Sequence, residues 1–459
     1  MSRFLLPLLC LGCLGLASAT ELARETQLVD GRQIPVTSRD TIRMAARDGD
    51  PDVKNRELWY RQRSEDSWGD WQRYSMSFGP DTPIQWRPTE GHWQVYVRIE
   101  EISGLIMARP DANTDAHQEF IVDRTAPAAT ITFPDNGAML SGGRAYTITW
   151  QVEDPHLHST PITLRWARSG DEVSFTTIAE NIANSGRHEW TTPVDMTAAG
   201  RLQLIAVDRA GNIATTASTN IVIDAVAPSA RINGPRIAAS REVELDIRAT
   251  DAGPAGLAEV ALYFSANDGE AWTRGPALRA PTDDDGSFSP TSLAWTAPAD
   301  GNYLLYLRGA DRAENINPEP RGAMGERAAR LIIDTQSPRI SLLSPIGVKY
   351  PDDKPGAPIR RVFRPDITVN VPFQIQDANL VPGSVTVYLQ PDTDAAWQVV
   401  AKDLDPDKPF SFQTPDIASR NVRIRVTCVD AAGNVGTATA SEVFRIDNRI
   451  QAPTVTIDL

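Results

Sequence analysis

The feature that most constrains the fold of this 459-residue chain is a five-residue motif that recurs at the end of an apolar stretch. The motif reads D-x-A-[GE]-N and occupies residues 208–212, 311–315 and 430–434. After each copy an apolar run ends on an aspartate that a proline follows. The three aspartates are Asp224, Asp334 and Asp447, and Asp123 is an earlier one in the same context. The four follow one another at intervals of 101, 110 and 113 residues. Because such a period has the size of a domain, the motif predicts a tandem array of domains and not a solenoid.

Other residues keep the same phase and define the extent of each repeat. Trp86, Trp190 and Trp295 each stand shortly before a proline, and Phe412 fills the equivalent place in the last copy. We therefore expect a divergent first repeat at 20–122, a second at 123–224, a third at 225–334 and a fourth at 335–447. The tail 448–459 resembles the first strand of a further repeat.

The hydrophobic period within a repeat is two. Residues 146–152 and 162–166 alternate, are rich in β-branched and aromatic side chains, and are bounded by turn residues. Six or seven such strands in about 100–110 residues are typical of an immunoglobulin-like or fibronectin-III-like sandwich. The predicted fold is all-β, with four tandem immunoglobulin-like β-sandwich domains after a signal peptide.

Residues 1–19 read as that signal peptide. A basic start with Arg3 precedes the apolar stretch 4–16, and Ala17-Ser18-Ala19 has the small-x-small form of a cleavage site. A membrane anchor is disfavoured because the stretch is too short to span a bilayer and contains Pro7. A lipoprotein signal ending at Cys13 is the alternative. We expect an exported protein of the cell surface, the extracellular space or the periplasm, without a transmembrane helix in the mature chain.

Composition excludes several function classes. Lys and Arg number 45 against 59 Asp and Glu, a net charge of −14 with no long basic run, which argues against nucleic acid as a partner. All five His lie in the first half of the chain, and no G-x-S-x-G elbow is present. We therefore predict that the protein is not an enzyme. Cys428 is the one thiol left after cleavage, and we expect it to act as a small buried hydrophobe.

The V-D-x-T-A-P linker at 122–127, together with the D-x-A-G-N turn, resembles the tandem bacterial immunoglobulin-like domains of secreted and surface proteins, many of them large adhesins. This resemblance implies a non-enzymatic rod that acts as a cell-surface or periplasmic spacer, or in adhesion or ligand binding. The ligand is then a surface protein or a glycan. The alternative is an accessory β-sandwich array of an extracellular hydrolase system directed at polysaccharide or protein.

Nine aspartates are the candidate site residues. In a sandwich, the end of strand B, the turn between strands F and G, and the preceding linker share one end of the domain. Three carboxylates are therefore expected to converge at each of three places: Asp123, Asp154 and Asp208; Asp224, Asp251 and Asp311; and Asp334, Asp377 and Asp430. Oxygen-only clusters suit Ca²⁺, and the resemblance also implies calcium at the junctions. The alternative is that each Asp only closes its own turn through a side-chain hydrogen bond.

Three further patterns could be functional, but each also has a purely structural interpretation. Residues 265–272 resemble an Asp-box but are predicted to form a hairpin between the third and fourth strands of a sandwich. His156 and His158 could offer metal nitrogens, although such a pair is usually a surface feature. The tryptophans in repeat phase are expected to pack in cores. Trp59, Trp68 and Trp93 crowd the first repeat, which is where we place a ligand surface if the chain has one.

Overall fold

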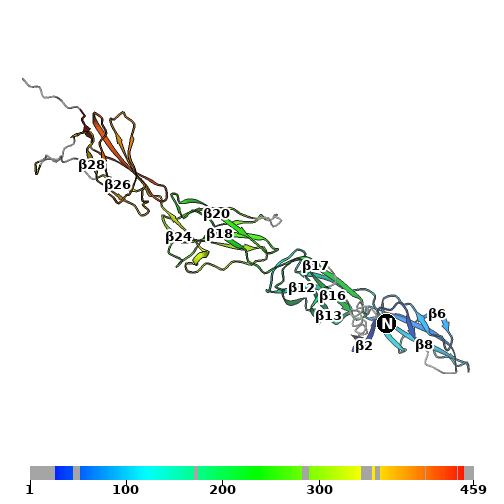
Figure 1. Cartoon of the computed structure of the whole chain (residues 1–459). Coiled ribbons are helices and arrows are strands. Elements are labelled where there is room, and N and C mark those ends of the chain that lie inside the picture. The colour runs from blue at the N-terminus through cyan, green and yellow to red at the C-terminus, as the bar shows by residue number, and fades with distance from the viewer. Residues whose placement is uncertain are drawn as a thin grey trace, which may run out of the picture. The chain divides into compact units, whose positions relative to one another are not determined.

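A computed structural model describes residues 26–44, 52–169, 174–281, 289–342, 354–356, 362–408, 410–441 and 443–448. The predicted signal peptide, and the tail beyond Asn448, lie outside the described residues. The chain forms two compact units. One comprises Met1–Val226 with Gly253–Ala255 and Ala313–Asn315, and the other comprises Ala227–Ala252, Gly256–Arg312 and Ile316–Leu459. Among the described residues every regular element is a β-strand except one 3₁₀ helix, η1 (Gly325–Arg327), as Figure 1 shows.

The second repeat shows the sandwich in its clearest form. Its three-stranded sheet has the order β10 (Ala128–Phe133), β12 (Ala145–Glu153) and β15 (Arg187–Thr191). Its five-stranded sheet has the order β11 (Met139–Ser141), β17 (Ile213–Asp224), β16 (Thr197–Asp208), β13 (Leu157–Ala167) and β14 (Thr176–Ile182). One core contains Trp150 and Trp190 from the first sheet and Leu164 and Leu204 from the second, so the two sheets face each other.

The third repeat follows the same plan. Its three-stranded sheet has the order β18 (Ser229–Ile232), β20 (Glu242–Thr250) and β23 (Ser292–Thr296). Its five-stranded sheet has the order β19 (Ile237–Ala238), β25 (Ala329–Ile333), β24 (Gly301–Asp311), β21 (Leu257–Ser265) and β22 (Thr273–Arg279). β21 pairs antiparallel with β22, which confirms the hairpin predicted at 265–272.

The first repeat departs from this plan at its N-terminal edge. Its larger sheet contains β1 (Thr26–Val29), β2 (Arg32–Thr37), β9 (Gln118–Val122), β8 (Gly91–Glu101), β4 (Val53–Ser64), β5 (Ser67–Trp68) and β6 (Gln72–Phe78). Its smaller sheet pairs β3 (Ile42–Met44) with β7 (Ile84–Trp86). β2 runs parallel to β9, as β11 runs parallel to β17, and β1 adds an outer antiparallel strand.

The fourth repeat divides one sheet into two short pairs. These pairs are β26 (Arg339–Leu342) with β29 (Phe373–Gln376), and β28 (Thr368–Val371) with β32 (Phe410–Gln413). The six-stranded sheet contains β27 (Val362–Phe363), β35 (Phe444–Ile446), β34 (Val435–Thr439), β33 (Ser419–Val429), β30 (Val385–Gln390) and β31 (Gln398–Leu404). Cys428 is fully buried in this core, 3.2 Å from the Ser384 hydroxyl, which confirms its predicted packing role.

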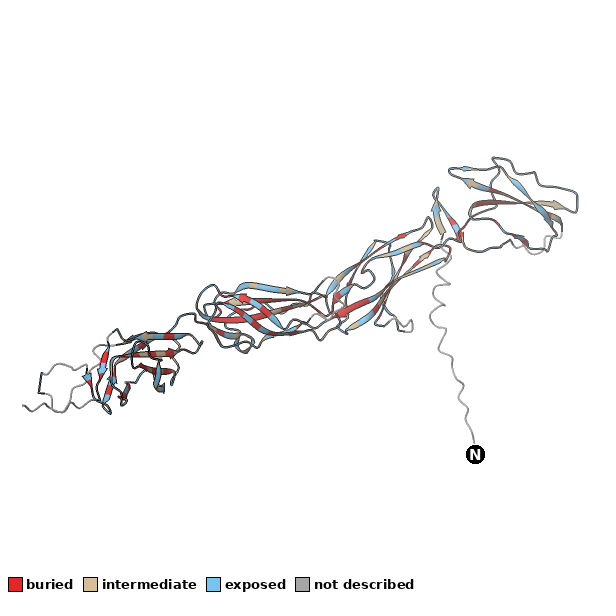
Figure 2. Cartoon of the chain, turned by 90° about the horizontal axis from the view of Figure 1, so that it is seen from above, coloured by how far each residue is buried: buried red, intermediate tan, exposed pale blue. Residues whose placement is uncertain are grey.

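Strand alternation gives each repeat its core. In β20 and β12, every second side chain is buried or half-buried, because successive side chains point to opposite faces of a strand. Figure 2 shows this as a change of colour from residue to residue along the strands. No helix among the residues that the structure describes is long and apolar enough to cross a membrane. The boundaries of the four predicted repeats stay a prediction.

Candidate metal centres at the ends of the sandwiches

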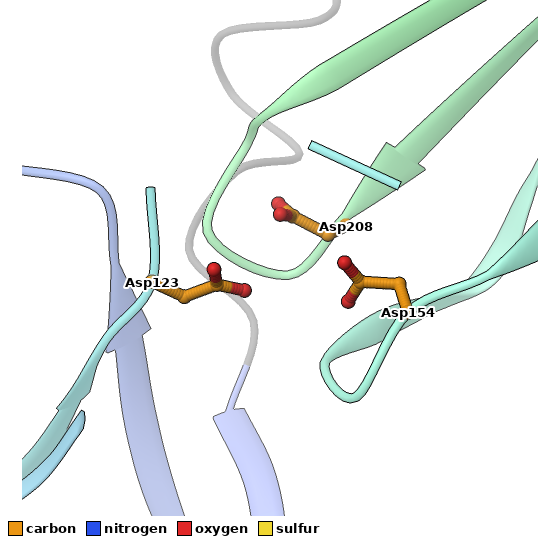
Figure 3. Close-up of side chains that lie close together, drawn as sticks. All are labelled: Asp123, Asp154 and Asp208. Atoms are coloured by element: carbon orange, nitrogen blue, oxygen red, sulfur yellow. The ribbon is translucent and has the colours of Figure 1, made fainter. Parts of the chain in front are cut away.

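Three carboxylates converge where the second repeat meets its preceding linker. Asp123 directly follows β9, Asp154 directly follows β12, and Asp208 is the last residue of β16. Each contributes an oxygen atom, and the three oxygens lie within 4.8 Å of one another. Figure 3 shows the three side chains pointing toward a common centre from separate elements. The structure therefore brings together the first predicted set of aspartates.

The D-x-A-G-N turn holds Asp208 in this position. Its Oδ1 accepts a hydrogen bond from the Asn212 backbone amide at 2.8 Å, and its Oδ2 accepts one from the Asn212 side-chain amide at 2.6 Å. Gly211 has a φ of 87°, a conformation that glycine adopts without steric cost. Asp208 is fully buried. The motif residues are therefore the ones needed to close a tight turn around a buried carboxylate.

The Asn212 side chain also joins the turn to the linker. Its side-chain amide donates to the carbonyl oxygen of Asp123 at 3.0 Å and to that of Thr125 at 3.2 Å. The Ala210 of the motif is buried in a small cluster with Ile34 and Val36 of the first repeat. One turn therefore fixes its own aspartate, the linker and the contact with the preceding repeat.

Asp123 and Asp154 each close a local turn, as the alternative interpretation predicts. Asp123 Oδ1 accepts from the Thr125 amide at 3.0 Å, and Asp154 Oδ1 accepts from the His156 amide at 2.6 Å. The Oδ2 of Asp123, however, is buried and has no hydrogen-bond partner among the described residues. Asp123 is only 6% exposed, and buried polar atoms normally have a hydrogen-bond partner. Closure of the turn uses Oδ1 of Asp123 and therefore does not account for the buried Oδ2.

The electrostatics of this cluster disfavour three ionised carboxylates. Burial raises the pKa of Asp123, of Asp154 and of Asp208 above its ordinary value. The negative charge of Asp154 raises the pKa of Asp123 further, and that of Asp208 raises the pKa of Asp154. A cation between the three oxygens would reverse both effects.

The spacing of the oxygens fits a calcium ion. Ca²⁺ binds oxygens at about 2.3–2.6 Å, so two ligands on opposite sides of one ion are separated by about 4.6–5.2 Å. The oxygens of Asp123, Asp154 and Asp208 lie within 4.8 Å of one another, inside that limit. The set contains only hard carboxylate oxygens, the ligand type that Ca²⁺ prefers.

The third predicted set also converges. Oxygens of Asp334, Asp377 and Asp430 lie within 4.8 Å of one another, contributed by the ends of β25, β29 and β33. Asp430 accepts from the backbone and side-chain amides of Asn434, both at 2.8 Å. The Asn434 amide in turn donates to the Asp334 carbonyl oxygen at 2.8 Å, as Asn212 does to Asp123.

One residue distinguishes this third set from the first. The side-chain amide of Asn379 donates to Asp334 Oδ2 at 2.5 Å, so the oxygen that has no partner in Asp123 has one in Asp334. His156 stands at the equivalent position of the second repeat: its carbonyl oxygen accepts from the Arg209 amide, as that of Asn379 accepts from the Ala431 amide. Sequence reasoning did not include Asn379, although its position two residues after Asp377 is a recognisable signal.

The members of the middle set belong to different compact units, Asp224 to the first and Asp251 and Asp311 to the second. Asp224, the last residue of β17, is fully buried, and its Oδ2 accepts from the Ala255 amide at 2.9 Å. Asp311 is the buried last residue of β24, and Asp251 follows β20. The middle site stays a prediction from the sequence.

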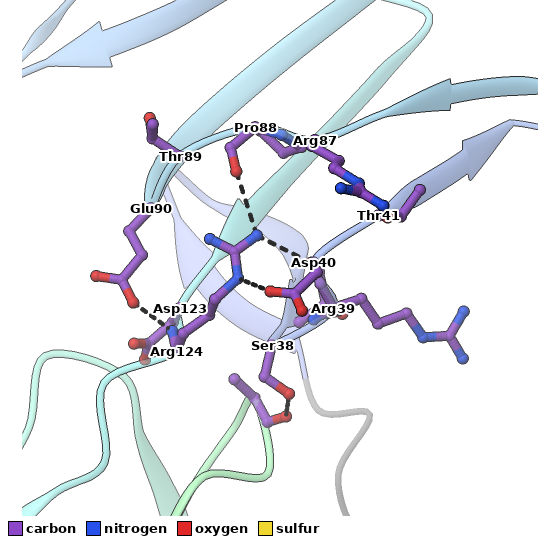
Figure 4. A network of polar contacts seen from close by, with 12 residues as sticks. Ser38, Arg39, Asp40, Thr41, Arg87, Pro88, Thr89, Glu90, Asp123 and Arg124 are labelled. Atoms are coloured by element: carbon purple, nitrogen blue, oxygen red, sulfur yellow. Dashed lines mark hydrogen bonds and ion pairs between the residues drawn. The ribbon is translucent and has the colours of Figure 1, made fainter.

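The linker after Asp123 is anchored to the first repeat as well. Figure 4 shows Arg124 in the centre of this network. Its Nε lies 3.0 Å from Asp40 Oδ1, and its Nη2 donates to the carbonyl oxygens of Arg39 and Pro88 at 3.1 and 3.2 Å. The Glu90 carboxylate accepts from the Arg124 backbone amide at 2.8 Å. The linker is therefore bound on both sides.

A carboxylate anchors the corresponding linker residue of the third repeat. Asp300 Oδ2 accepts from the Thr335 amide at 3.2 Å and from its hydroxyl at 2.8 Å. Arg241 Nε donates to the other oxygen of Asp300 at 2.8 Å. A glycine with positive φ follows each of these anchors, Gly91 at 138° and Gly301 at 146°. These anchors were not foreseen, because they join loops that are distant in sequence.

The histidine pair differs from its predicted surface role. His158 is buried, and its Nδ1 lies 3.1 Å from the Thr160 amide. His156 is half-buried and its ring contacts the Gln27 side chain in β1. The two rings therefore serve different local contacts. Neither belongs to a cluster of metal-ligating side chains among the described residues.

The tryptophans separate into two groups. Trp86, Trp150, Trp190 and Trp295 are buried in the cores, as predicted. The prediction of core packing was wrong for three others, which are only half-buried because they lie beside hairpin turns: Trp71, Trp272 and Trp397. In the first repeat Trp93 is buried, and Trp59 and Trp68 are half-buried.

Comparison with known proteins supports the fold. The model of a family described as the Kre9/KNH-like N-terminal Ig-like domain matches residues 133–220, which lie within the second repeat. That repeat has the two facing sheets described above. The chain is a tandem Ig-like β-sandwich protein. No curated protein sequence matches it.

Several solved structures resemble parts of this tandem Ig-like β-sandwich protein. Fibronectin(III)-like modules of Clostridium thermocellum CbhA are 15% identical, over 45% of this chain and 94% of theirs, with a TM-score of 0.28. A structure of a bacterial ice-binding adhesin is 15% identical over 71% and 99%, with a TM-score of 0.27. Three N-terminal domains of the bacteriophage RB49 outer capsid protein Hoc are 10% identical over 71% and 99%, with a TM-score of 0.32. Because these scores are low, the fold assignment depends on the sheets and on the family model.

Proposed function

We propose that the chain is an exported, non-catalytic array of Ig-like domains that acts as a spacer, adhesion or ligand-binding protein at the cell surface or in the periplasm. In this proposal Ca²⁺ bound between Asp123, Asp154 and Asp208 stiffens the linker. Two observations together carry the calcium site: Asp123 Oδ2 is buried without a hydrogen-bond partner among the described residues, and the Asp123 carboxylate clusters with those of Asp154 and Asp208. The predicted signal peptide supports export.

A calcium ion at this position would have a defined structural effect. Asp123 lies in the linker, whereas Asp154 and Asp208 belong to the end of the second repeat. An ion bound to all three would join the linker to that end and offset the repulsion among the carboxylates. The hydrogen bonds of Asn212 already hold the linker close, so little further ordering would oppose binding.

The set of Asp334, Asp377 and Asp430 is the second site of this proposal. Rotation of the Asn379 side-chain amide by half a turn would place its oxygen where its nitrogen lies now. This oxygen would add one neutral ligand to the three carboxylate ligands of the ion. The first set lacks this amide. The two sites should therefore differ in affinity, within the broad range of about 10⁻⁷ to 10⁻³ M that protein calcium sites cover.

Calorimetric titration of the mature chain with CaCl₂ after EDTA treatment tests the proposal. We expect saturable binding, a higher melting temperature with Ca²⁺ than with Mg²⁺, and loss of one binding event in Asp154→Asn. The exposed Asp195 gives a matched control, since Asp195→Asn removes the same charge elsewhere in the second repeat. Absence of calcium binding, or equal effects of both variants, would refute the calcium site.

A further inference from the structure

A pocket of about 310 Å³ opens on the first repeat beside the hairpin that follows β4. Arg61 of β4 and Trp68 of β5 line it on the hairpin side together with Asp70 and Trp71, and the loop after β8 contributes Asp111. It belongs neither to the carboxylate clusters nor to the linker contacts. Its volume lies at the lower end of the range of about 300–1,000 Å³ found for small-molecule sites.

The arginine of this pocket is buried without a carboxylate partner. Arg61 is 8% exposed, and Glu119, the carboxylate that acts on it electrostatically, forms its salt bridges with Arg32 and His92 instead. Its Nε donates to Gln94 Oε1 at 2.8 Å and its Nη1 to the Ala112 carbonyl oxygen at 3.3 Å. Its Nη2 has no partner among the residues described. The guanidinium therefore keeps a donor available at the pocket.

A chain of polar contacts holds this guanidinium in place. The Gln94 side chain that accepts from Arg61 donates in turn to Glu119 at 2.9 Å. The other Glu119 oxygen lies 2.8 Å from His92 Nε2. Because each group has a partner on the next strand, the position of Arg61 is fixed before any ligand arrives.

The Trp71 indole is also held in place by its contacts. Trp71 donates from its ring nitrogen to the Asp111 carbonyl oxygen at 2.9 Å, and its ring meets Tyr96 edge-on. The Arg61 guanidinium lies 4.4 Å from the centre of the Trp71 ring and 5.5 Å from that of Trp68. Both tryptophans remain half-buried, so part of each ring is open to solvent.

The third repeat has a neutral side chain at the position of Arg61. Tyr263 pairs with Tyr306 as Trp59 pairs with Tyr96, so Ser265, two residues after Tyr263, is the counterpart of Arg61. Ser265 is fully buried, and its hydroxyl oxygen accepts from the Gly269 amide at 2.9 Å.

The fourth repeat also has a neutral polar side chain at the position of Arg61. Gln390, two residues after Tyr388, is the counterpart of Arg61 there. Its side-chain amide donates to the carbonyl oxygens of Thr393 and Ala395 at 3.1 and 2.8 Å, within its own hairpin. Hairpin closure therefore needs only a neutral polar side chain. The charge of Arg61 and its free donor are additional features of the first repeat.

We propose that this pocket binds a neutral carbohydrate. A hexose ring presents apolar C–H faces that pack on the open parts of Trp68 and Trp71. Its hydroxyl groups accept a hydrogen bond from Arg61 and donate one to the Asp70 carboxylate, because a hydroxyl is both donor and acceptor. The acidic rim formed by Asp70 and Asp111 disfavours an anionic ligand. A neutral sugar uses both the donor and the acceptor of the pocket.

Titration calorimetry of the mature chain with neutral glucose, galactose and mannose trisaccharides tests this proposal. Trigalacturonic acid serves as the anionic probe. Two variants remove the proposed contacts: Trp68→Ala removes a stacking face, and Arg61→Gln removes the charge but introduces the residue that closes the equivalent hairpin in the fourth repeat. We expect each variant to weaken binding of the preferred neutral trisaccharide by roughly tenfold while the melting temperature changes little.

Trp397→Ala is the matched control. Trp397 is also a half-buried hairpin tryptophan, with the Arg425 guanidinium 4.0 Å from its ring centre, and its loss should leave binding unchanged. Binding of the anionic probe alone, binding of no probe at millimolar concentration, or undiminished binding by both pocket variants would each overturn the proposal. The calcium measurement is unaffected by any of these results, since it concerns other residues.

Discussion

Replacing Asn212 with alanine tests whether the motif turn fixes the linker. The substitution removes the side-chain amide that donates to Asp208 Oδ2 and to the carbonyl oxygens of Asp123 and Thr125. The backbone amide of residue 212 still donates to Asp208 Oδ1, so the turn itself keeps one closing bond. The effect should therefore be confined to the junction between the first two repeats.

The expected magnitude follows from burial. Asp208 is fully buried, so its Oδ2 loses its donor where water cannot replace it, at a cost of about 2 kcal/mol. The two linker carbonyls are partly exposed and regain water, which leaves a loss of about 0.5 kcal/mol each. Together these terms amount to about 3 kcal/mol, or an opening equilibrium shifted by about 100-fold.

Amide hydrogen exchange of the intact mature chain, in EDTA, measures this opening. The amides of Asp123 and Thr125 are suitable probes, because they donate to Thr37 O and Asp123 Oδ1. Their exchange should accelerate by about 100-fold in Asn212→Ala. Asn434→Ala is the matched control and should leave these two amides unchanged. Unchanged exchange at the junction, or acceleration spread evenly over the second repeat, would refute the reasoning.

Three further predictions concern the second compact unit. Hydrogen bonds from Arg241 and Thr335 lower the pKa of Asp300, so its stabilising effect is present above its ordinary pKa of 3.8 and is lost on acidification. The melting temperature of Asp300→Asn should therefore lie below that of the wild type at pH 7, and the difference should shrink below pH 3.8. Ser265→Ala leaves buried hairpin amides without an acceptor and should cost the third repeat about 1–3 kcal/mol in calorimetric unfolding. Burial raises the pKa of the Cys428 thiol, so alkylation of the mature chain should require denaturant, and rapid labelling of the native protein would contradict the buried position.

The convergence of the aspartates was predictable because strand order alone determines it. Asp154 and Asp208 end strands that point toward the same end of a sandwich, and Asp123 ends the strand that enters it. Any sequence with these alternating strands places the three residues near one another. The burial of Asp208 also follows from the sequence, because Asp208 occupies the last position of the alternating buried series in β16.

The second function of Asn212 and the capping of Asp334 by Asn379 were not predictable in this way. Both depend on a hydrogen bond between a side chain of one element and the linker. The hydrophobic period of a sequence contains no information about such a contact. The same limit applies to the pocket of the first repeat. The sequence placed a crowd of tryptophans there, but the burial of Trp93 and the position of Arg61 between Trp68 and Trp71 come from strand register and side-chain packing.

The contacts between the first two repeats are made mostly to main-chain atoms. Asn212 donates to two linker carbonyls, and the Ser38 hydroxyl donates to the Ala210 carbonyl oxygen at 3.0 Å. Every residue type offers such carbonyls. The two bonds from Asn212 therefore do not depend on the side chains of the linker, whereas the Ser38 hydroxyl bond and the packing of Ala210 against Ile34 and Val36 require particular residues of the first repeat. The Asp, Ala and Asn of the motif recur at 208–212, 311–315 and 430–434, while the residues around them differ from copy to copy.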